Sequence, residues 1–469
     1  GCPVWMAGLV TVERVKVNHI LNKYISVFLF HRKGTGENNR NRIINKTQSK
    51  EQTTEKKQQT KNKHKTKMSL PDKFDTELTK VLGIRYPIMC AGMGHVTGAE
   101  LAAAVSNAGG IGTIGAIGMS PEGCRAEVKR LKSMLLPGDS IAGTLPFGLD
   151  LLLPQVGGNA RKTNKDYTGG QLEALVDVMV EEKVPLFVCA VGIPPQWVVD
   201  KLHENGILIM NMAGRPKHVS KALALGVDII CATGGEGGAH SGDISTVVLL
   251  PQCADMCKGK AVLVGGGGIF DGRGIAACFA LGAQGVWVGT RFLSSLEANC
   301  NKGWHKAILK AGSNDTRRIE IYTGRPLRVI KNKYNDEWAN REAEMRELLG
   351  KGIVPIQQAM RDGKINPKTY FGGPLSRHGQ GIGKRPEEGF WNDVRDDEMW
   401  NEDSDCAQAG QAIGGITSIP PAAALVKSMM EELASCLQSL GRMGSQVPNN
   451  PKFDVGKIPD VKPLTLSNL

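Results

Sequence analysis

Short apolar runs alternate with amphipathic stretches along the middle of the chain. The runs that predict strands lie at 86–90, 111–114, 147–153, 186–190, 207–212, 228–232, 261–264 and 285–288. Between them, apolar residues recur at three- and four-residue spacing, which is typical of helices packed on one side. Runs that are apolar throughout belong to strands buried on both faces, as in parallel sheets. Eight strand–helix units over about 200 residues therefore predict an α/β fold, a TIM (β/α)8 barrel.

The alternative for this pattern is an open, doubly wound sheet. Such a sheet normally carries a G-x-G-x-x-G turn after its first strand. In this chain the dense glycine runs follow the sixth, seventh and eighth predicted strands instead. A TIM barrel places its phosphate site after strands seven and eight, so the glycine positions favour the barrel.

Composition changes along the chain and divides it into four parts. We expect a basic disordered extension at 1–67, the barrel at 68–330, a smaller C-terminal helical segment at 331–440 and a loose tail at 441–469. Within the third part, the stretch 376–405 is rich in Gly, Trp and charged residues and is interpreted as an insertion. Residues 421–440 repeat apolar positions as an amphipathic helix does.

The net charge of +12 is concentrated in the extension. Residues 1–67 hold 15 Lys and Arg against 4 Glu, so the remainder is nearly neutral. A neutral folded part gives no electrostatic basis for binding nucleic acid. We also find no apolar run of about 20 residues, the length that a membrane-spanning helix needs. The eleven cysteines are scattered, without metal-ligand spacing, and indicate a reduced, cytoplasmic protein with no metal site. Whether 1–67 is a targeting segment or a dispensable extension stays open, as does the oligomeric state.

Two glycine-rich stretches carry the candidate chemistry. The first surrounds His240 with five glycines in nine positions after the sixth predicted strand, which suggests a steric need for glycine. A histidine at the mouth of a barrel is suited to act as a general base. The second contains Gly267 and Gly268 and is followed by Gly289 and Thr290 after the last strand. Free N–H groups and a hydroxyl there predict a site for a phosphorylated cofactor.

A third loop, after the first predicted strand, contains Gly92 and Met93. Its small and flexible residues suit a flat ring lying above the barrel mouth. Simple packing of Met93 at the top of the barrel is the alternative.

The motifs together resemble the nitronate monooxygenase (2-nitropropane dioxygenase) family over about residues 75–440. They are YPIMCAGM (86–93), AGGIG (108–112), FGLD (147–150), EGGAH (236–240), GGIFDGRG (267–274) and GTRF (289–292). The resemblance implies an FMN-dependent TIM barrel that oxidises nitronates or nitroalkanes with O2 to a carbonyl compound and nitrite. It implies His240 as the catalytic base. The residues implied or predicted to bind FMN are Gly92, Met93, Asp150, Thr233, Gly238, Gly267, Gly268, Trp287, Val288, Gly289 and Thr290.

Two positions depart from the family pattern. The family usually has Asn where Asp150 stands and Gln where Thr233 stands. An ionised carboxylate near the ring would disfavour the anionic reduced flavin unless Asp150 is protonated or turned away. Two alternatives therefore stay open: an NAD(P)H-dependent FMN reductase of quinones or enoyl thioesters, and a flavin-binding protein without turnover.

Overall fold

A computed structural model describes residues 71–136, 145–365 and 401–445 of the 469-residue chain. The predicted extension at 1–67, most of the predicted insertion (376–400) and most of the predicted tail (446–469) lie outside the described residues. The described residues belong to one compact unit of the chain.

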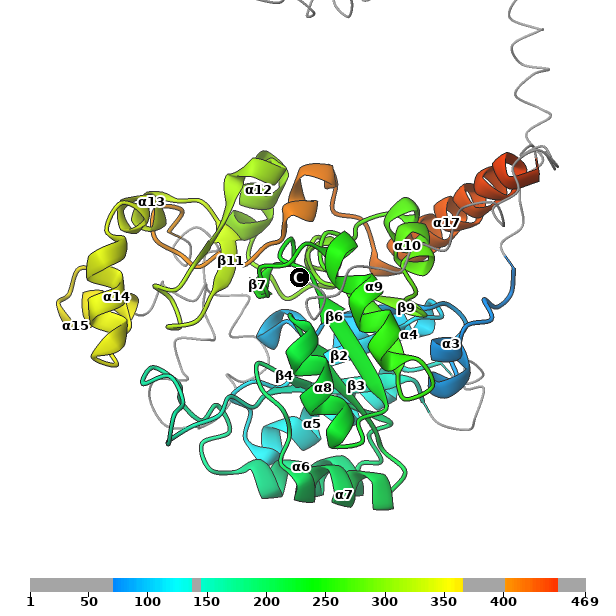
Figure 1. Ribbon diagram of the computed structural model, residues 1–469, viewed down its shortest axis with the longest axis horizontal. Coiled ribbons are helices and arrows are strands. Elements are labelled where there is room, and N and C mark those ends of the chain that lie inside the picture. The colour runs from blue at the N-terminus through cyan, green and yellow to red at the C-terminus, as the bar shows by residue number, and fades with distance from the viewer. Residues whose placement is uncertain (1–70, 137–144, 366–400, 446–469) are drawn as a thin grey trace, which may run out of the picture. The chain divides into compact units, whose positions relative to one another are not determined.

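Eight parallel strands close into a barrel, so the predicted fold class is confirmed (Figure 1). The last strand pairs with the first, with Ile88 opposite Val286. The barrel strands are β1 (Ile88–Cys90), β2 (Ile111–Gly115), β3 (Phe147–Leu152), β4 (Leu186–Ala190), β5 (Leu208–Ala213), β6 (Ile229–Thr233), β8 (Val262–Gly266) and β9 (Gly285–Val288).

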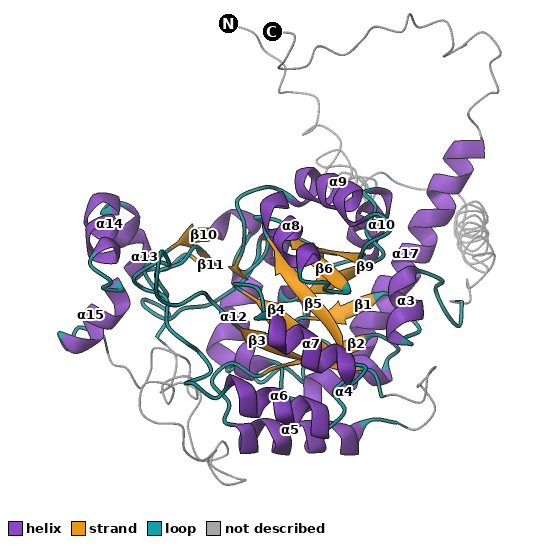
Figure 2. Ribbon diagram, turned by 60° about the horizontal axis from the view of Figure 1, so that its bottom comes forward, coloured by secondary structure: helices purple, strands orange, loops and turns teal. Residues whose placement is uncertain are grey.

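Helices follow the barrel strands and cover their outer faces (Figure 2). Their apolar sides form a continuous buried core with the outward-facing strand residues. These helices are α4 (Ala99–Asn107), α5 (Pro121–Met134), α6 (Leu172–Glu181), α7 (Gln196–Glu204), α8 (Pro216–Ala224), α9 (Thr246–Cys257), α10 (Gly272–Ala280) and the short α11 (Thr290–Leu293).

A second apolar cluster fills the inside of the barrel. It includes Met89, Met210 and Trp287 from three strands. Leu78 of helix α3 (Glu77–Leu82) belongs to the same cluster, and a Cβ added at Gly285 would lie 2.1 Å from its Cδ2 atom. Because Gly285 begins β9, α3 closes the amino-terminal end of the barrel. The carboxyl ends of the strands are left to form the site.

A separate three-stranded sheet lies beyond the barrel and corrects the predicted boundary at residue 330. Strands β10 (Thr316–Ile319) and β11 (Leu327–Ile330) form an antiparallel hairpin, and β7 (Ala239–His240) pairs with β11. The hairpin has its own apolar cluster with the helices that follow it. Helices α12 (Lys302–Lys310), α13 (Lys333–Ala339), α14 (Glu342–Gly350) and α15 (Pro355–Arg361) occupy the segment around this sheet.

The chain returns to the barrel at its C-terminal end. A short 3-10 helix, η5 (Gln411–Gly415), precedes helix α17 (Ala422–Ser445), which packs against α10 and α4. A Cβ added at Gly272 would lie 2.2 Å from the backbone nitrogen of Leu433, so a glycine is needed for this close approach. The helix continues past residue 440, where a loose tail was predicted to begin. Within the described ranges, no helix is both long and apolar enough to cross a membrane.

Candidate functional site

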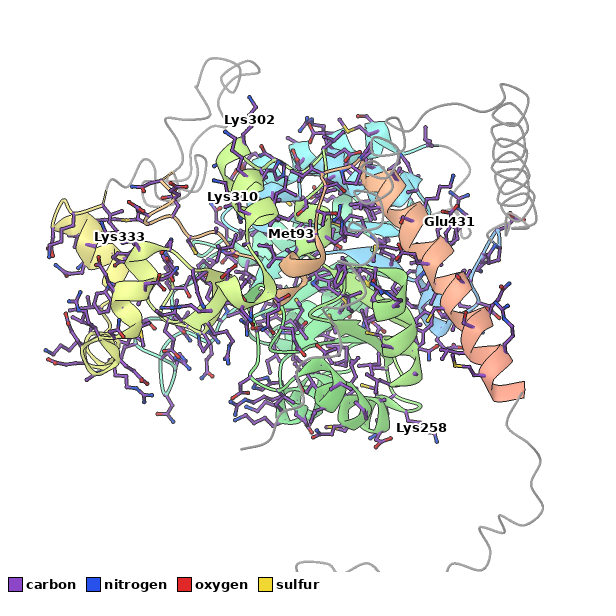
Figure 3. All side chains as sticks on the ribbon, turned by 90° about the horizontal axis from the view of Figure 1, so that it is seen from above. Met93, Lys258, Lys302, Lys310, Lys333 and Glu431 are labelled. Atoms are coloured by element: carbon purple, nitrogen blue, oxygen red, sulfur yellow. The ribbon has the colours of Figure 1, made fainter. Side chains whose placement is uncertain are left out.

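A cavity of about 1960 Å³ opens at the carboxyl ends of the barrel strands. Ligand pockets usually enclose roughly 300–1,000 Å³, so this cavity has room for a cofactor together with a substrate. Met93 lies among the side chains near the middle of the view in Figure 3, whereas Lys258 and Lys333 lie near its margins.

Most of the predicted site residues come together around this cavity. Those that line it are Gly92, Met93, Asp150, Thr233, Gly238, His240, Gly267, Gly268, Trp287, Gly289 and Thr290. The side chain of Val288 does not line the cavity, and its role in cofactor binding stays a prediction. Its side chain faces outward into the core between strands and helices, and its carbonyl oxygen accepts a hydrogen bond from the Ala91 N–H at 3.0 Å.

The loop after β8 presents backbone donors to the cavity. Gly267 and Gly268 have φ angles of +98° and +77°, which side chains rarely tolerate. Among the described residues, no protein acceptor takes the N–H groups of Gly267 and Gly268, nor those of Gly289 and Thr290. Unpaired N–H groups on neighbouring loops are the arrangement that binds a phosphate.

The loop before α17 completes this part of the site. The N–H of Gly410 donates to the hydroxyl oxygen of Thr290 at 2.9 Å, which leaves the hydroxyl hydrogen of Thr290 free to donate. A Cβ added at Gly238 would lie 2.7 Å from the Gly410 nitrogen, so the histidine loop and the C-terminal loop touch through glycine.

Asp150 lies near the carboxyl end of β3, in a buried position next to Gly92. A Cβ added at Gly92 would lie 2.5 Å from the Asp150 Cβ, so only glycine fits there. Within the part of the chain that the structure describes, the buried Oδ1 atom of Asp150 has no hydrogen-bond partner. Burial raises the pKa of this carboxyl well above its usual value and so favours its neutral form. In that form Asp150 resembles the Asn that the family usually has.

Thr233 ends β6 beneath the histidine loop. Its hydroxyl oxygen lies 3.6 Å from the sulfur of Cys231, and a Cβ added at Gly266 would lie 2.9 Å from that oxygen. Threonine is smaller than the Gln that the family usually has at this position. Thr233 thus occupies the floor of the cavity without reaching across it.

His240 is positioned by the second sheet rather than by the barrel. Strand β7 places it opposite Leu327 of β11, and its Nδ1 atom lies 3.1 Å from the carbonyl oxygen of Pro326. A carbonyl only accepts, so Nδ1 carries the proton and Nε2 is an unprotonated base. Burial lowers the pKa of His240 to about 4, and the positive charge of Arg325 acts in the same direction. The hydrogen bond to the Pro326 carbonyl oxygen opposes this shift. The preceding residue, Ala239, has a φ angle of +59°, a strained conformation of the kind that clusters at functional sites.

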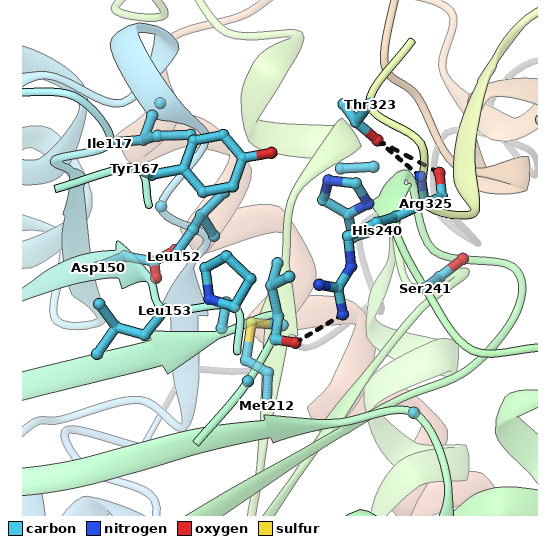
Figure 4. A pocket seen from close by; sticks show the side chains of 18 of the residues that line it. Ile117, Asp150, Leu152, Leu153, Tyr167, Met212, His240, Ser241, Thr323 and Arg325 are labelled. Carbon is cyan, nitrogen blue, oxygen red and sulfur yellow. Dashed lines mark hydrogen bonds between the residues drawn. The ribbon is translucent and has the colours of Figure 1, made fainter. Parts of the chain in front are cut away.

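Sequence reasoning missed a group of polar residues facing His240. Arg325 comes from the loop between β10 and β11, and Tyr167 comes from the loop after β3 (Figure 4). Neither lies in a motif, and Arg325 lies 85 positions after His240. The sequence offered one signal for this group, the pair Arg325-Pro326, which lies in a segment that was assigned to the barrel.

Comparisons with known proteins agree with this architecture. The nitronate monooxygenase family model matches residues 75–432. A Staphylococcus saprophyticus protein named "Probable nitronate monooxygenase" is 32% identical over 294 residues, 56% of this chain and 80% of that relative. An octahydroindene-carboxyl-CoA dehydrogenase of Mycobacterium tuberculosis is 32% identical over 257 residues, 55% of this chain and 66% of that relative.

The structure of FabK from Thermotoga maritima superposes with a TM-score of 0.61 at 27% identity. It covers 79% of this chain and 99% of that one. Three observations lead to one assignment. They are a family match over most of the described barrel, a closed eight-stranded fold and a barrel mouth lined by glycines. The chain belongs to the nitronate monooxygenase family, whose members are flavin-dependent oxidoreductases acting on small molecules.

Proposed function

We propose that the protein binds FMN at the barrel mouth and oxidises nitronates and nitroalkanes with O2. The observation that carries the proposal is the juxtaposition of the unpaired N–H groups of Gly267, Gly268, Gly289 and Thr290 with the free Nε2 atom of His240. The N–H groups suit one phosphate group, and the Nε2 atom of His240 suits a base above the flavin ring.

The residues present fit this cofactor. The N–H groups and the Thr290 hydroxyl would hold the phosphate, since each is a donor without a competing acceptor. Gly92 and Asp150 line the cavity side by side, and the carboxyl of Asp150 would donate a hydrogen bond to a ring acceptor in its protonated form, which burial favours. In that form it would also not repel the anionic reduced ring as an ionised carboxylate would.

His240 would perform the proton chemistry. With a neutral nitroalkane, its Nε2 atom would take the proton from the carbon that bears the nitro group and leave the nitronate anion. FMN, when bound, would supply the electron-accepting chemistry for oxidation of that anion with O2 to a carbonyl compound and nitrite. With a nitronate supplied as such, the proton transfer is not needed and His240 would orient the anion.

The cofactor part of the proposal is tested by purification and absorbance spectroscopy. We expect a yellow protein that releases FMN, and not FAD, when it is denatured, because the site offers one phosphate cradle. A colourless preparation that takes up no flavin during incubation with FMN contradicts the proposal.

A further inference from the structure

Arg325 is a half-buried cation beside the candidate base. Its Nη1 atom donates to the side-chain oxygen of Asn164 at 3.0 Å, and its Nη2 atom donates to the carbonyl oxygen of Val191 at 3.1 Å. A guanidinium has five N–H donors, so three are left for a ligand. Figure 4 shows the side chain next to His240, between the loop that carries Thr323 and the loops of the barrel mouth.

The backbone around Arg325 holds this position firmly. A Cβ added at Gly324, whose φ angle is +73°, would lie 2.4 Å from Thr163, so the hairpin loop approaches the loop after β3 very closely. The side chains of Thr163 and Arg161 both donate to the carbonyl oxygen of Gly324, each at 3.3 Å. Val191 has a φ angle of +69°, which is a real outlier for a β-branched residue, and its carbonyl oxygen accepts from Arg325.

Arg325 has no carboxylate partner among the described residues. The charged and titratable groups that act on it or feel its charge are Arg161, Tyr167, His218 and His240. Burial, followed by the charge of Arg161, lowers the pKa of Arg325. Partial burial removes some of the water around this cation without supplying a counter-ion, and a bound anion would offset that cost.

The rest of the cavity wall is also positively charged. Further cations that line it are Lys165, Lys217, Lys221, Arg318 and Arg361. The acidic residues on the wall are largely engaged: Asp243 pairs with Arg215, and Asp166 accepts hydrogen bonds from Thr168 and Gly170. Burial raises the pKa of Asp150 and favours its neutral form, as described above. The cavity is therefore electropositive and favours anions.

We propose that Arg325 binds the planar oxyanion group of the substrate. The inference rests on the proposed function and names the residue that recognises the substrate anion. A nitronate and a carboxylate share two oxygens in one plane and one negative charge, and a guanidinium fork binds such a group through two parallel hydrogen bonds.

The test measures anion binding without turnover. Isothermal titration calorimetry of the purified holoenzyme with propionate, an unreactive planar anion, is compared with propionamide, which has similar size and no charge. We expect propionate to bind, and Arg325→Gln to weaken its binding by about 10-fold or more, because hydrogen bonds between charged partners are the strong ones. Arg325→Lys keeps the charge but loses the fork, so its affinity should lie between the two.

Arg346→Gln is the matched control, because Arg346 is an exposed arginine on α14 that pairs with Glu342. It should bind propionate as the wild type does. Flavin content and melting temperature of each variant establish that the protein is folded. Equal propionate affinity for wild type and Arg325→Gln overturns the proposal, and so does a wild-type protein that does not bind propionate.

Two further outcomes separate this inference from others. If Arg325→Gln leaves propionate binding intact but weakens binding of NADPH, the arginine recognises a nucleotide and the proposal is wrong. If the protein binds propionate through Arg325 but takes up no FMN, the proposed function fails while the assignment of Arg325 stands.

Discussion

The Nδ1 atom of His240 lies 3.1 Å from the carbonyl oxygen of Pro326, a residue 86 positions further along the chain. This contact ties the glycine-rich loop of the barrel to the hairpin of the second sheet. It also fixes the imidazole tautomer, because the carbonyl oxygen can only accept a hydrogen bond. The candidate base is thus defined by two parts of the fold together.

Replacing His240 by Asn should affect the turnover of a neutral nitroalkane more than the turnover of a preformed nitronate. Turnover of a neutral nitroalkane should fall by about 10²–10⁴-fold, because a positioned general base contributes about that much. Turnover of the preformed nitronate should fall much less, since its carbon-bound proton is already gone. Steady-state oxygen uptake measures both. Equal losses for the two substrates would show that His240 has a binding or structural role instead.

The pH dependence of nitroalkane turnover follows from the same residue. His240 accepts a proton only when it is neutral, and burial lowers its pKa to about 4. Activity should therefore persist as the pH falls below the ordinary histidine value of about 6.5, and it should decline only near pH 4. Initial rates in stable pH buffers test this, with His240→Asn as the control for other titrating groups. An acid limb centred near pH 6.5 that His240→Asn abolishes contradicts the account.

The barrel could be predicted from the sequence because its strands are apolar on both faces. Strands β4 and β9 have the bounds that the apolar runs predicted, and the other barrel strands differ by one or two residues at their ends. Strands β10 and β11 were missed because they are short and their apolar residues are interrupted by arginines, Arg317 and Arg318 in β10 and Arg328 in β11. Strand β7 is two residues long and exists only because β11 pairs with it.

One part of the site could likewise be predicted from the sequence, and another part could not. Glycine density identified the loops that line the cavity, since glycine is required where backbones approach closely. Local pattern could not identify Arg325, which reaches His240 through the fold of a distant hairpin. Nor could it show that Val288 faces away from the cavity, because a one-residue change along a strand reverses the direction of the side chain.

Substitution of Gly267 by Ala should impair cofactor binding. The φ angle of +98° disfavours any side chain, and the added Cβ would lie 3.0 Å from the Gly234 carbonyl oxygen and from the Thr246 hydroxyl. We expect a cost of about 1–3 kcal/mol in the loop conformation and a matching loss of bound FMN.

Gly259→Ala provides the control for this variant. Gly259 also has a positive φ angle, +68°, but a Cβ there meets nothing within 4 Å, and it lies away from the cavity. It should lower the melting temperature slightly and leave flavin content unchanged. Measured flavin-to-protein ratios decide the matter, and equal flavin loss in both variants would refute the assignment of the phosphate loop.

Asp150→Asn should stabilise the protein more at high pH than at low pH. The raised pKa of Asp150 means that the folded protein holds this proton more tightly than the unfolded chain does. Its contribution to stability is therefore complete below about pH 4 and is lost as the pH rises toward the folded-state pKa. The Asn side chain has the same shape and no such loss. Thermal melts of both proteins between about pH 5 and pH 9 should diverge with rising pH, and a constant difference would mean that Asp150 is not held neutral.

Oxygen uptake by the purified, FMN-loaded protein tests the central claim most directly. The comparison is between a preformed nitronate without nicotinamide and NAD(P)H with a quinone, with nitrite measured in parallel. The account predicts rapid oxygen consumption with the nitronate, accompanied by nitrite, and little oxidation of NAD(P)H. Oxidation of NAD(P)H by the quinone, with no oxygen uptake from the nitronate, would contradict it and identify a reductase instead.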